Sequence, residues 1–501
     1  MKLLYYILYI IFMVLTVKVP AQVTDTGKYG PLLSLHSLYQ SRMVLQQNAQ
    51  IRFSGSAAAG NVVGVTTSWG VKALAVTDTN NSWTLEFFTP KVKKYDFSNY
   101  QVTVESGDVR LVLDSVQIGE VWLCSGQSNM EMTMDARPPW HQGVLNREKE
   151  IDQARHPNIR VLTLKRQGLP YLRQNFTGTW QSIHPDVAAN TSGVGYYFAR
   201  LLQQQLQVPV GIVVAAHGGA ACQAFIPKEG LQSDSVLFKR YLKNFVYDLQ
   251  DKNPEYRPTL IFQAMLNPLR NLSFKGVLWY QGESNSNDTI LYPKLLQALI
   301  ASWKKHFQRN ELPFYYVQMT PYNWNKQDSG AYNYALFREA QERSLLLPQT
   351  GMVCTMDVGE PNNIHPRNKK PVGERLAALA LHNEYGRNNI ERSGPRMQSV
   401  RFKGFNVTVV FNRRGTGAGL GTSDGAMPRH FFLAGEDCSF YPANAIIKGR
   451  TISLSSSAVK KPVAVRYAFT NDAVTNFQNK AGWPAFPFRT DRWPQATYSF
   501  Q

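Results

Sequence analysis

Residues 119–130 read GEVWLCSGQSNM. Residues 120–124 form a short, largely apolar run of the kind expected for a strand that is buried on both faces of a sheet. Gly126 allows a tight turn after that strand. Ser128 then lies at the carboxyl edge of the sheet, where open α/β folds bind their ligands. The stretch therefore predicts an α/β core that presents Ser128 to a ligand.

Apolar runs of the same kind recur toward the C-terminus. Further apolar runs predict buried strands at residues 159–164, 210–215, 276–280, 314–318 and 351–356. Amphipathic segments between and after them predict helices at residues 194–205, 261–269, 292–306, 334–346 and 372–385. Strands and helices that alternate in this way predict a parallel sheet with helices on both faces.

Shorter alternating segments, separated by turns, flank this core. On the N-terminal side they predict strands at residues 50–53, 62–67, 83–87, 101–104 and 109–113. On the C-terminal side they predict strands at residues 399–402, 406–411, 430–433, 446–447, 451–454 and 464–468. We therefore expect β-domains at 22–117 and 387–501 around an α/β domain at 118–386.

Residues 1–21 have the features of a secretory signal. Lys2 supplies a positive charge, residues 3–17 are apolar, and Val19-Pro20-Ala21 resembles a cleavage site. The apolar stretch is shorter than the roughly 20 residues that cross a bilayer, which favours a cleaved signal over an anchor. We expect an exported protein, periplasmic or secreted, with no membrane span after the signal has been removed.

The composition excludes several classes of protein. Hydrophobic residues make up 44% and aromatic residues 12% of the chain, enough for large cores and against a disordered chain. The net charge is +19, but Lys and Arg are scattered, which predicts a solvated basic surface rather than a nucleic-acid site. Four widely spaced cysteines are too few for a disulfide scaffold or a CxxC metal site, although one disulfide stays open.

Ser128 needs a base within hydrogen-bond reach, because a serine hydroxyl is a poor nucleophile at neutral pH. His365 lies in Asn-Asn-Ile-His-Pro (residues 362–366), between a late strand and a predicted helix. Pro366 keeps His365 out of helical geometry, as suits a base on a defined loop. His217, in the loop after strand 210–215, is the rival candidate. We favour His365.

Two further loops offer donors for a developing oxyanion. Gln281, in WYQGESN (residues 279–285), follows a buried strand and carries a neutral amide donor. Gly218 and Gly219 follow another strand and allow backbone N–H groups to approach a substrate closely. Taken alone, each signal has an ordinary explanation: Ser128 fits a helix N-cap, and a glycine pair fits a turn.

At these segments the sequence resembles the sialate O-acetylesterase family within the SGNH hydrolases. The resemblance runs from the MVLQ of residues 43–46 to the FRTD of residues 488–491. Its most specific motifs are GEVWLCSGQSNMEM (119–132), WYQGESN (279–285), IHPRNKKPVGERLA (364–377) and PVAVRYAFTN (462–471). The resemblance implies a flavodoxin-like three-layer core between β-domains, with a serine esterase that needs no metal or organic cofactor.

Carried over position by position, the resemblance implies Ser128 as nucleophile and His365 as base. It implies that Gly219 and Gln281 are oxyanion donors beside the Ser128 backbone N–H. In this chemistry His365 takes the Ser128 proton, an acetyl-enzyme forms, and water activated by the same histidine releases acetate. The expected substrate is an O-acetylated sialic acid, and acetylated xylan or another polysaccharide is the alternative.

The chain departs from the family pattern at Asn363, where relatives often carry an aspartate two residues before the histidine. An asparagine can orient an imidazole but cannot stabilise the imidazolium with a full charge. Three outcomes stay open: a Ser-His dyad held by a backbone carbonyl, a carboxylate recruited from Asp357 or Glu360, or a weakened enzyme. We favour the dyad.

A second departure is His-Gly-Gly-Ala at residues 217–220, where relatives tend to have Trp-Gly-Gly-Thr, so the sugar pocket could differ. A hypothesis from another functional class is that the chain is a carbohydrate-binding protein whose active site has decayed. Against it stands the presence of Ser128, Gln281 and His365 together.

Overall fold

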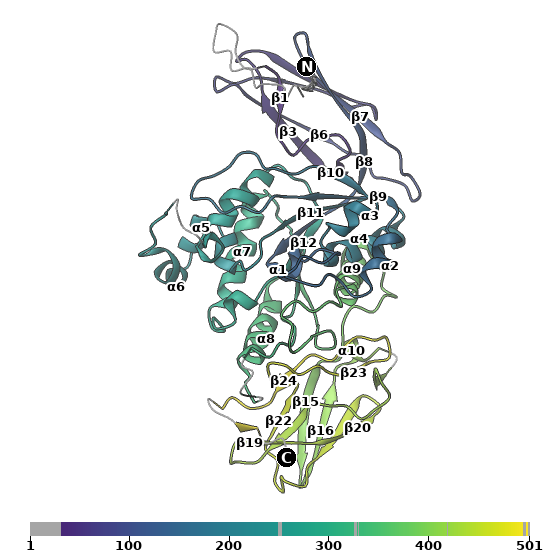
Figure 1. Ribbon diagram of the computed structural model, residues 1–501, viewed down its shortest axis with the longest axis vertical. Coiled ribbons are helices and arrows are strands. Elements are labelled where there is room, and N and C mark those ends of the chain that lie inside the picture. Colours follow the sequence, from purple (N-terminus) through teal and green to yellow (C-terminus); the bar gives the residue numbers. More distant parts are fainter. Residues whose placement is uncertain are drawn as a thin grey trace, which may run out of the picture.

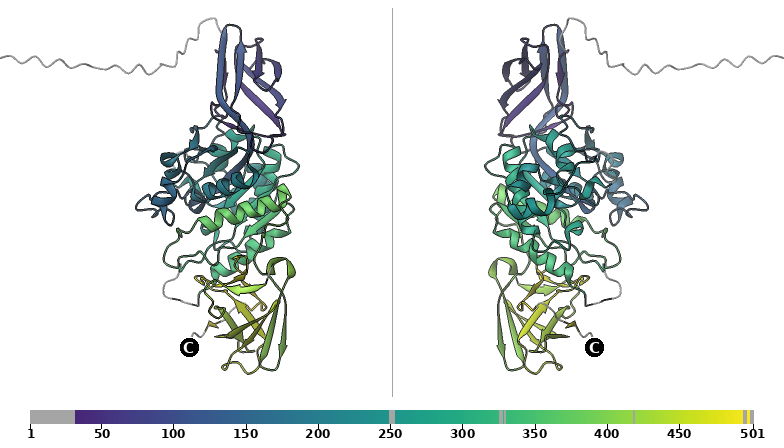
Figure 2. Two further views of the ribbon diagram at one scale, coloured as in Figure 1. Left: turned by 90° about the vertical axis from the view of Figure 1, so that its right-hand side faces the viewer. Right: turned by 90° about the vertical axis from the view of Figure 1, so that its left-hand side faces the viewer.

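The computed structural model describes residues 32–248, 253–324, 328, 330–417, 419–493 and 497–498. The predicted signal at residues 1–21 lies outside the described residues. The molecule is elongated, with N-terminal strands at one end, an α/β core in the middle and C-terminal strands at the other end (Figures 1 and 2).

The core sheet has the strand order β10-β9-β11-β8-β12-β13-β14. All neighbours from β9 to β14 are parallel, and β10 pairs antiparallel with β9 at the edge. The strands are β8 (Val109–Gly126), β9 (His156–Thr163), β10 (Trp180–Ile183), β11 (Val210–Ala216), β12 (Gly276–Tyr280), β13 (Phe314–Val317) and β14 (Thr350–Val353). The predicted α/β class is confirmed, but β10 was not predicted and adds an antiparallel strand at one edge of the parallel sheet.

Successive side chains of β8 enter two different apolar cores, which explains its continuous apolar run. Val121 and Leu123 pack in one core with α7 (Tyr292–His306). Trp122 and Cys124 pack in the other with α4 (Gly193–Leu206) and α9 (Lys370–Tyr385). Helices therefore cover both faces of the sheet.

The helix predicted at residues 261–269 is irregular. A π-helical turn, η4 (Phe262–Leu266), is followed by a 3₁₀ turn, η5 (Asn267–Leu269). Pro268 has no backbone N–H and cannot continue a regular α-helix, which accounts for the break. By contrast, α8 (Asn333–Arg343) lies where the sequence predicts a helix.

β8 is a single strand of 18 residues, although the sequence predicts two strands within it. Its first half pairs antiparallel with β7 (Tyr100–Ser106), and its middle pairs parallel with β2 (Val44–Gln46). β2 and β7 are thus hydrogen-bonded to the core sheet through β8, and β4 (Val62–Thr67) and β5 (Lys72–Val76) extend this sheet from β7. β1 (Ser34–Leu35), β3 (Gln50–Ser56) and β6 (Ser82–Phe88) form a separate three-stranded sheet.

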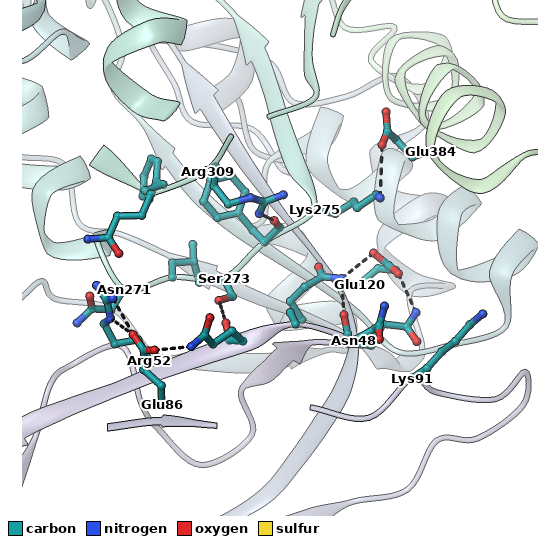
Figure 3. Close-up of a pocket in the computed structure, with 18 of the residues that line it drawn as sticks. Asn48, Arg52, Glu86, Lys91, Glu120, Asn271, Ser273, Lys275, Arg309 and Glu384 are labelled. Carbon is teal, nitrogen blue, oxygen red and sulfur yellow. Dashed lines mark hydrogen bonds and ion pairs between the residues drawn. The ribbon is translucent and has the colours of Figure 1, made fainter. Parts of the chain in front are cut away.

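A polar cavity of about 920 Å³ lies where the N-terminal strands meet the core (Figure 3), and we call it the seam cavity. Glu120 is 5% exposed and accepts hydrogen bonds from the amides of Gln46 and Gln47 and from the hydroxyl of Tyr385. Two ion pairs also line it: Arg52 with Glu86 at 2.7 Å, and Lys275 with Glu384 at 3.4 Å.

The C-terminal region forms a four-stranded sheet, a five-stranded sheet and a two-stranded pair. The guanidinium of Arg466, in β22 (Ala464–Tyr467), binds both carboxylate oxygens of Asp491 at 2.9 and 2.8 Å, and both side chains are buried. Arg338 of α8 donates to the carbonyls of Thr470 and Asn471. The Arg338 contacts join the C-terminal region to the core, and the Arg466–Asp491 pair stabilises that region from within.

The remaining strands of this region are β15 (Met397–Lys403), β16 (Asn406–Phe411), β17 (Leu420–Thr422), β18 (Phe431–Ala434), β19 (Ser439–Pro442), β20 (Asn444–Lys448), β21 (Thr451–Ser455), β23 (Phe477–Asn479), β24 (Phe488–Arg489) and β25 (Thr497–Tyr498). All four cysteines of the chain fall within the described residues and are free thiols, three of them buried. Within the described ranges, none of the helices has the length and apolar character needed to cross a membrane.

Candidate active site

The turn that carries Ser128 lies at the switch point of the sheet, since β8 has β11 on one side and β12 on the other. Gly126 ends β8 with φ +132°, and a Cβ there would lie 2.2 Å from the carbonyl oxygen of Tyr280. Only glycine fits this close approach. Ser128 follows as the first residue of the short helix α1 (Ser128–Glu131).

Ser128, Gly219 and His365 all line one cavity of about 890 Å³, which we call the reaction cavity. Among the described residues, neither the hydroxyl of Ser128 nor Nε2 of His365 has a hydrogen-bond partner. Three segments far apart in the sequence thus meet at the carboxyl edge of the sheet. Both groups that the predicted chemistry needs are uncommitted there, and within the described residues the hydrogen bond predicted between the Ser128 hydroxyl and the His365 imidazole is not formed.

His217, the rival base, does not line this cavity. It is 7% exposed, and its Nδ1 lies 3.0 Å from the carbonyl oxygen of the adjacent Gly218. Burial lowers the pKa of His217 to about 4. The structure therefore brings His365, and not His217, to the cavity that contains Ser128.

The ring of His365 is oriented by a backbone group. Its Nδ1 lies 3.0 Å from the carbonyl oxygen of Trp140, so in the neutral ring Nδ1–H donates to that carbonyl and Nε2 carries the lone pair. Burial lowers the pKa of His365, the nearby Lys369 ammonium lowers it further, and the Trp140 carbonyl opposes them. The imidazole is consequently neutral at physiological pH, as a general base must be.

Asn363 acts on the backbone of the histidine loop rather than on the ring. Its Oδ1 accepts a hydrogen bond from the backbone N–H of His365 at 3.0 Å, and its Nδ2 donates to Glu360 at 3.0 Å. Asn363 therefore shapes the loop, while the imidazole contact is made by Trp140. Trp140 precedes His365 by 225 positions, and a backbone carbonyl leaves no signal in the sequence.

The two carboxylates considered as replacements for the family aspartate are engaged elsewhere. Asp357 binds both terminal nitrogens of Arg375, at 2.8 and 2.6 Å. Glu360 accepts from the backbone N–H of Arg367 at 2.7 Å and from Asn363. Neither contacts the imidazole of His365, so this geometry agrees with the backbone-carbonyl alternative.

Two backbone N–H groups are available near Ser128. Gly219 has φ +76°, which favours glycine, and its N–H has no acceptor within the described part of the chain. The hydroxyl of Ser284 donates to the Gly219 carbonyl at 2.6 Å and holds the peptide group that follows Gly219. The N–H of Ser128 begins α1, where a helix has no internal acceptor for it.

Gln281 is not brought to the reaction cavity with the other predicted residues. It is 1% exposed, and its Nε2 donates to Asn285 at 2.8 Å and to the Ala220 carbonyl at 3.3 Å. Its Oε1 accepts from the hydroxyl of Tyr292 at 3.0 Å. In this arrangement the amide joins loops beneath the cavity instead of facing it.

The cavity wall combines exposed aromatic rings with a surplus of carboxylates. Trp140, Trp324 and Tyr256 are 75%, 64% and 50% exposed, and exposed apolar surface around a polar cleft is typical of a ligand-binding groove. The charged lining residues are Glu131, Glu255, Glu283, Asp288, Arg137 and Arg166. Within the described ranges, no group of three His, Cys, Asp or Glu side chains is arranged to hold a metal ion.

Comparison with known proteins identifies the family of the chain. Residues 118–382 match the family model described as carbohydrate esterase, sialic acid-specific acetylesterase. The sialate O-acetylesterase of Rattus norvegicus is 27% identical over 421 residues, which cover 74% of this chain and 76% of the rat protein. The sialate O-acetylesterase of Homo sapiens is 29% identical over 325 residues, 60% of each chain.

A solved structure supports the same assignment. The crystal structure of a carbohydrate acetylesterase from Xanthomonas citri superposes with a TM-score of 0.82 at 29% identity, over 92% of this chain and 100% of the other. Fold, cavity and relatives together define a carbohydrate acetylesterase. The family model covers more than half of this chain. The chain therefore belongs to the carbohydrate esterase family of sialic acid-specific acetylesterases. The family resemblance of the motifs is confirmed.

Proposed function

We propose that residues 118–386 form a flavodoxin-like SGNH esterase domain that removes O-acetyl groups from sugars through an acetyl-enzyme. Ser128 is the nucleophile and His365 is the general base. The observation that carries this proposal is the convergence of Ser128, Gly219 and His365 on one cavity, with the serine hydroxyl and Nε2 both unpartnered among the described residues.

In this mechanism Nε2 of His365 accepts the proton as Oγ of Ser128 attacks the ester carbonyl. The N–H groups of Ser128 and Gly219 donate to the developing oxyanion. The sugar hydroxyl leaves with the proton from His365, and the acetyl group stays on Ser128. Water activated by His365 then releases acetate, with the Trp140 carbonyl holding Nδ1–H throughout.

Gln281 was predicted as a third oxyanion donor. For that role its amide would have to release Asn285 and the Ala220 carbonyl as an ester binds. We therefore assign stabilisation of the oxyanion to the N–H groups of Ser128 and Gly219. Gln281 contributes only if such a rearrangement takes place.

The leading substrate is an O-acetylated sialic acid, as the names of the curated relatives suggest. The carboxylate of a sialic acid needs a positively charged side chain in the cavity. Arg166 is paired with Glu131 at 2.9 Å, whereas among the described residues the guanidinium of Arg137 hydrogen-bonds to the neutral side chain of Asn190. Arg137 is thus the group that we expect to meet a sialic acid carboxylate.

A specific observation favours the second candidate, an acetylated neutral polysaccharide such as xylan. Four carboxyl groups line the reaction cavity against two guanidinium groups, although the protein as a whole carries a net charge of +19. Like charges disfavour an anionic substrate, whereas exposed aromatic rings suit an uncharged sugar chain.

Acetate release from an O-acetylated sialoglycan and from acetylated xylan, measured in parallel, decides between them. A preference for the sialoglycan that disappears in Arg137→Gln supports the sialate reading, and a strong preference for xylan rejects it. A 4-nitrophenyl acetate assay tests the esterase itself. No hydrolysis by the folded wild-type protein would favour a carbohydrate-binding role.

A further inference from the structure

Each of three segments around the reaction cavity contributes one side chain to a buried polar cluster. Asn129 comes from α1, directly after Ser128, and is 0% exposed. Glu283 is half-buried, lines the reaction cavity and begins η6 (Glu283–Asn285), which follows β12. Lys369 lies directly before α9 and is 1% exposed. The predicted catalytic chemistry uses none of these three side chains.

Asn129 is the centre of the cluster. Its Oδ1 accepts a hydrogen bond from the ammonium of Lys369 at 2.5 Å. Its Nδ2 donates to a carboxyl oxygen of Glu283 at 2.6 Å and to the backbone carbonyl of Ile364 at 3.1 Å. Since Asn129 adjoins Ser128 and Ile364 adjoins His365, one amide links the nucleophile's turn to the base's loop.

The cluster is costly to bury. A charged side chain removed from water is expensive unless it is paired and hydrogen-bonded. Burial lowers the pKa of Lys369 to about 7, with Glu283 and Glu360 opposing, and burial raises the pKa of Glu283. The second carboxyl oxygen of Glu283 is buried without a partner among the described residues. Apolar residues would fill this space at lower cost, which points to a functional reason.

We propose that Lys369, Asn129 and Glu283 form a positioning unit that holds the Ser128 turn against the His365 loop. The proposal rests on the proposed roles of Ser128 and His365. The unit acts through the backbone neighbours of both residues, so it sets the distance and angle between hydroxyl and imidazole. When protonated, Lys369 also places a positive charge near the imidazole.

The surroundings of Lys369 define the electrostatic readout. The ammonium lies 5.4 Å from the centre of the Tyr280 ring. The titratable groups that interact with it are the carboxyls of Glu283 and Glu360 and the imidazoles of His365 and His141. Removal of the ammonium takes away a charge that lowers the pKa of His365. That pKa should therefore rise when Lys369 becomes neutral.

The test compares Lys369→Met with Lys370→Met. Both variants remove one lysine charge at neighbouring positions, but Lys370 is solvent-exposed and its ammonium lies 3.5 Å from Glu150 on the surface. Lys369→Met should lower kcat roughly tenfold to a hundredfold with little change in KM, because misplaced reacting groups cost rate rather than binding. The acid limb of kcat/KM should also move to higher pH. Lys370→Met should leave all three parameters unchanged.

A second variant keeps the proposal testable if Lys369→Met does not fold. Glu283→Gln retains the shape of the side chain and an acceptor for Asn129, but it removes the carboxylate beside Lys369. We expect a fall in kcat at unchanged KM that is smaller than that of Lys369→Met. In the double variant the two effects should not add, since both residues act through Asn129.

The outcomes separate this proposal from the proposed function. If Ser128→Ala remains active, both fail. If Ser128→Ala is inactive and Lys369→Met behaves like Lys370→Met, only the positioning unit is rejected. A fall in kcat with an unmoved acid limb, accompanied by a large drop in thermal midpoint, would mean a structural role only and would also reject it.

Discussion

The seam cavity and the reaction cavity are similar in size but differ in how their polar groups are used. In the seam cavity of about 920 Å³, Arg52 pairs with Glu86, Lys275 pairs with Glu384, and Glu120 accepts from three neutral donors. These polar groups are paired with one another where the N-terminal strands meet the core.

The reaction cavity of about 890 Å³ keeps groups free instead. Within the described part of the chain, the Ser128 hydroxyl, Nε2 of His365, the Gly219 N–H and a carboxyl oxygen of Glu283 have no hydrogen-bond partner. Size alone therefore does not identify the active site. Uncommitted polar groups at the carboxyl edge of the sheet do so, since buried polar groups are normally satisfied.

Ser128→Ala and Ser273→Ala test this contrast most severely. Ser128 lines the reaction cavity, while Ser273 lines the seam cavity and donates to the Gln50 carbonyl at 2.7 Å. We expect acetate release to fall roughly a thousandfold or more in Ser128→Ala, because the nucleophile is lost. Ser273→Ala should retain wild-type turnover. Equal losses in both variants would contradict the assignment.

His365→Gln should lose roughly as much activity as Ser128→Ala, because nucleophile and base act as a unit. His217→Gln, outside the cavity, should keep nearly full turnover with 4-nitrophenyl acetate. The reverse pattern would make His217 the base.

Gly219→Ala should reduce kcat roughly a hundredfold, as expected for a displaced oxyanion donor. A side chain at φ +76° strains the loop and moves its N–H. Steady-state kinetics on a short-acyl ester measure the effect. An unchanged kcat would exclude this N–H from the oxyanion hole.

The pH dependence tests the environment of His365. The base must be neutral, and burial together with Lys369 lowers its pKa from the ordinary 6.5. Activity should therefore persist below pH 6.5 before it falls, and the acid limb of kcat/KM reports that pKa. An acid limb of kcat/KM with its midpoint above pH 6.5 would show that a carboxylate, and not the Trp140 carbonyl, faces the imidazole ring.

The smallest effect on activity is expected at the seam. Glu120→Gln replaces an acceptor with an amide that cannot accept from all of Gln46, Gln47 and Tyr385. It should lower the free energy of unfolding by about 1–3 kcal/mol, measured by denaturant titration, and leave turnover unchanged. A large loss of turnover would mean that the seam cavity takes part in the reaction.

Much of the core could be predicted from the sequence because its signals are local. The apolar run of β12 and the periodicity of α7 were both predicted with the bounds that the structure has. Ser128 could be singled out because it follows a predicted strand, and His365 because it precedes a proline. Such cues lie within a few residues of the group that they identify.

The rest depends on contacts between distant segments. The Trp140 carbonyl that orients His365, the bond from Gln281 to the Ala220 carbonyl and the link from Asn129 to Lys369 join residues far apart in the chain. The continuity of β8 likewise depends on its pairing with β2 and β7. No local pattern of hydrophobicity encodes these pairings.

The most direct test of the central claim is covalent. A phosphonylating probe that reacts with activated serine hydroxyls, followed by digestion and mass spectrometry, identifies the nucleophile of the active protein. We predict a single adduct on Ser128, formed in step with loss of acetate release and strongly slowed in His365→Gln. Full inactivation with the adduct on another residue, or an active enzyme that leaves Ser128 unlabelled, would contradict the account.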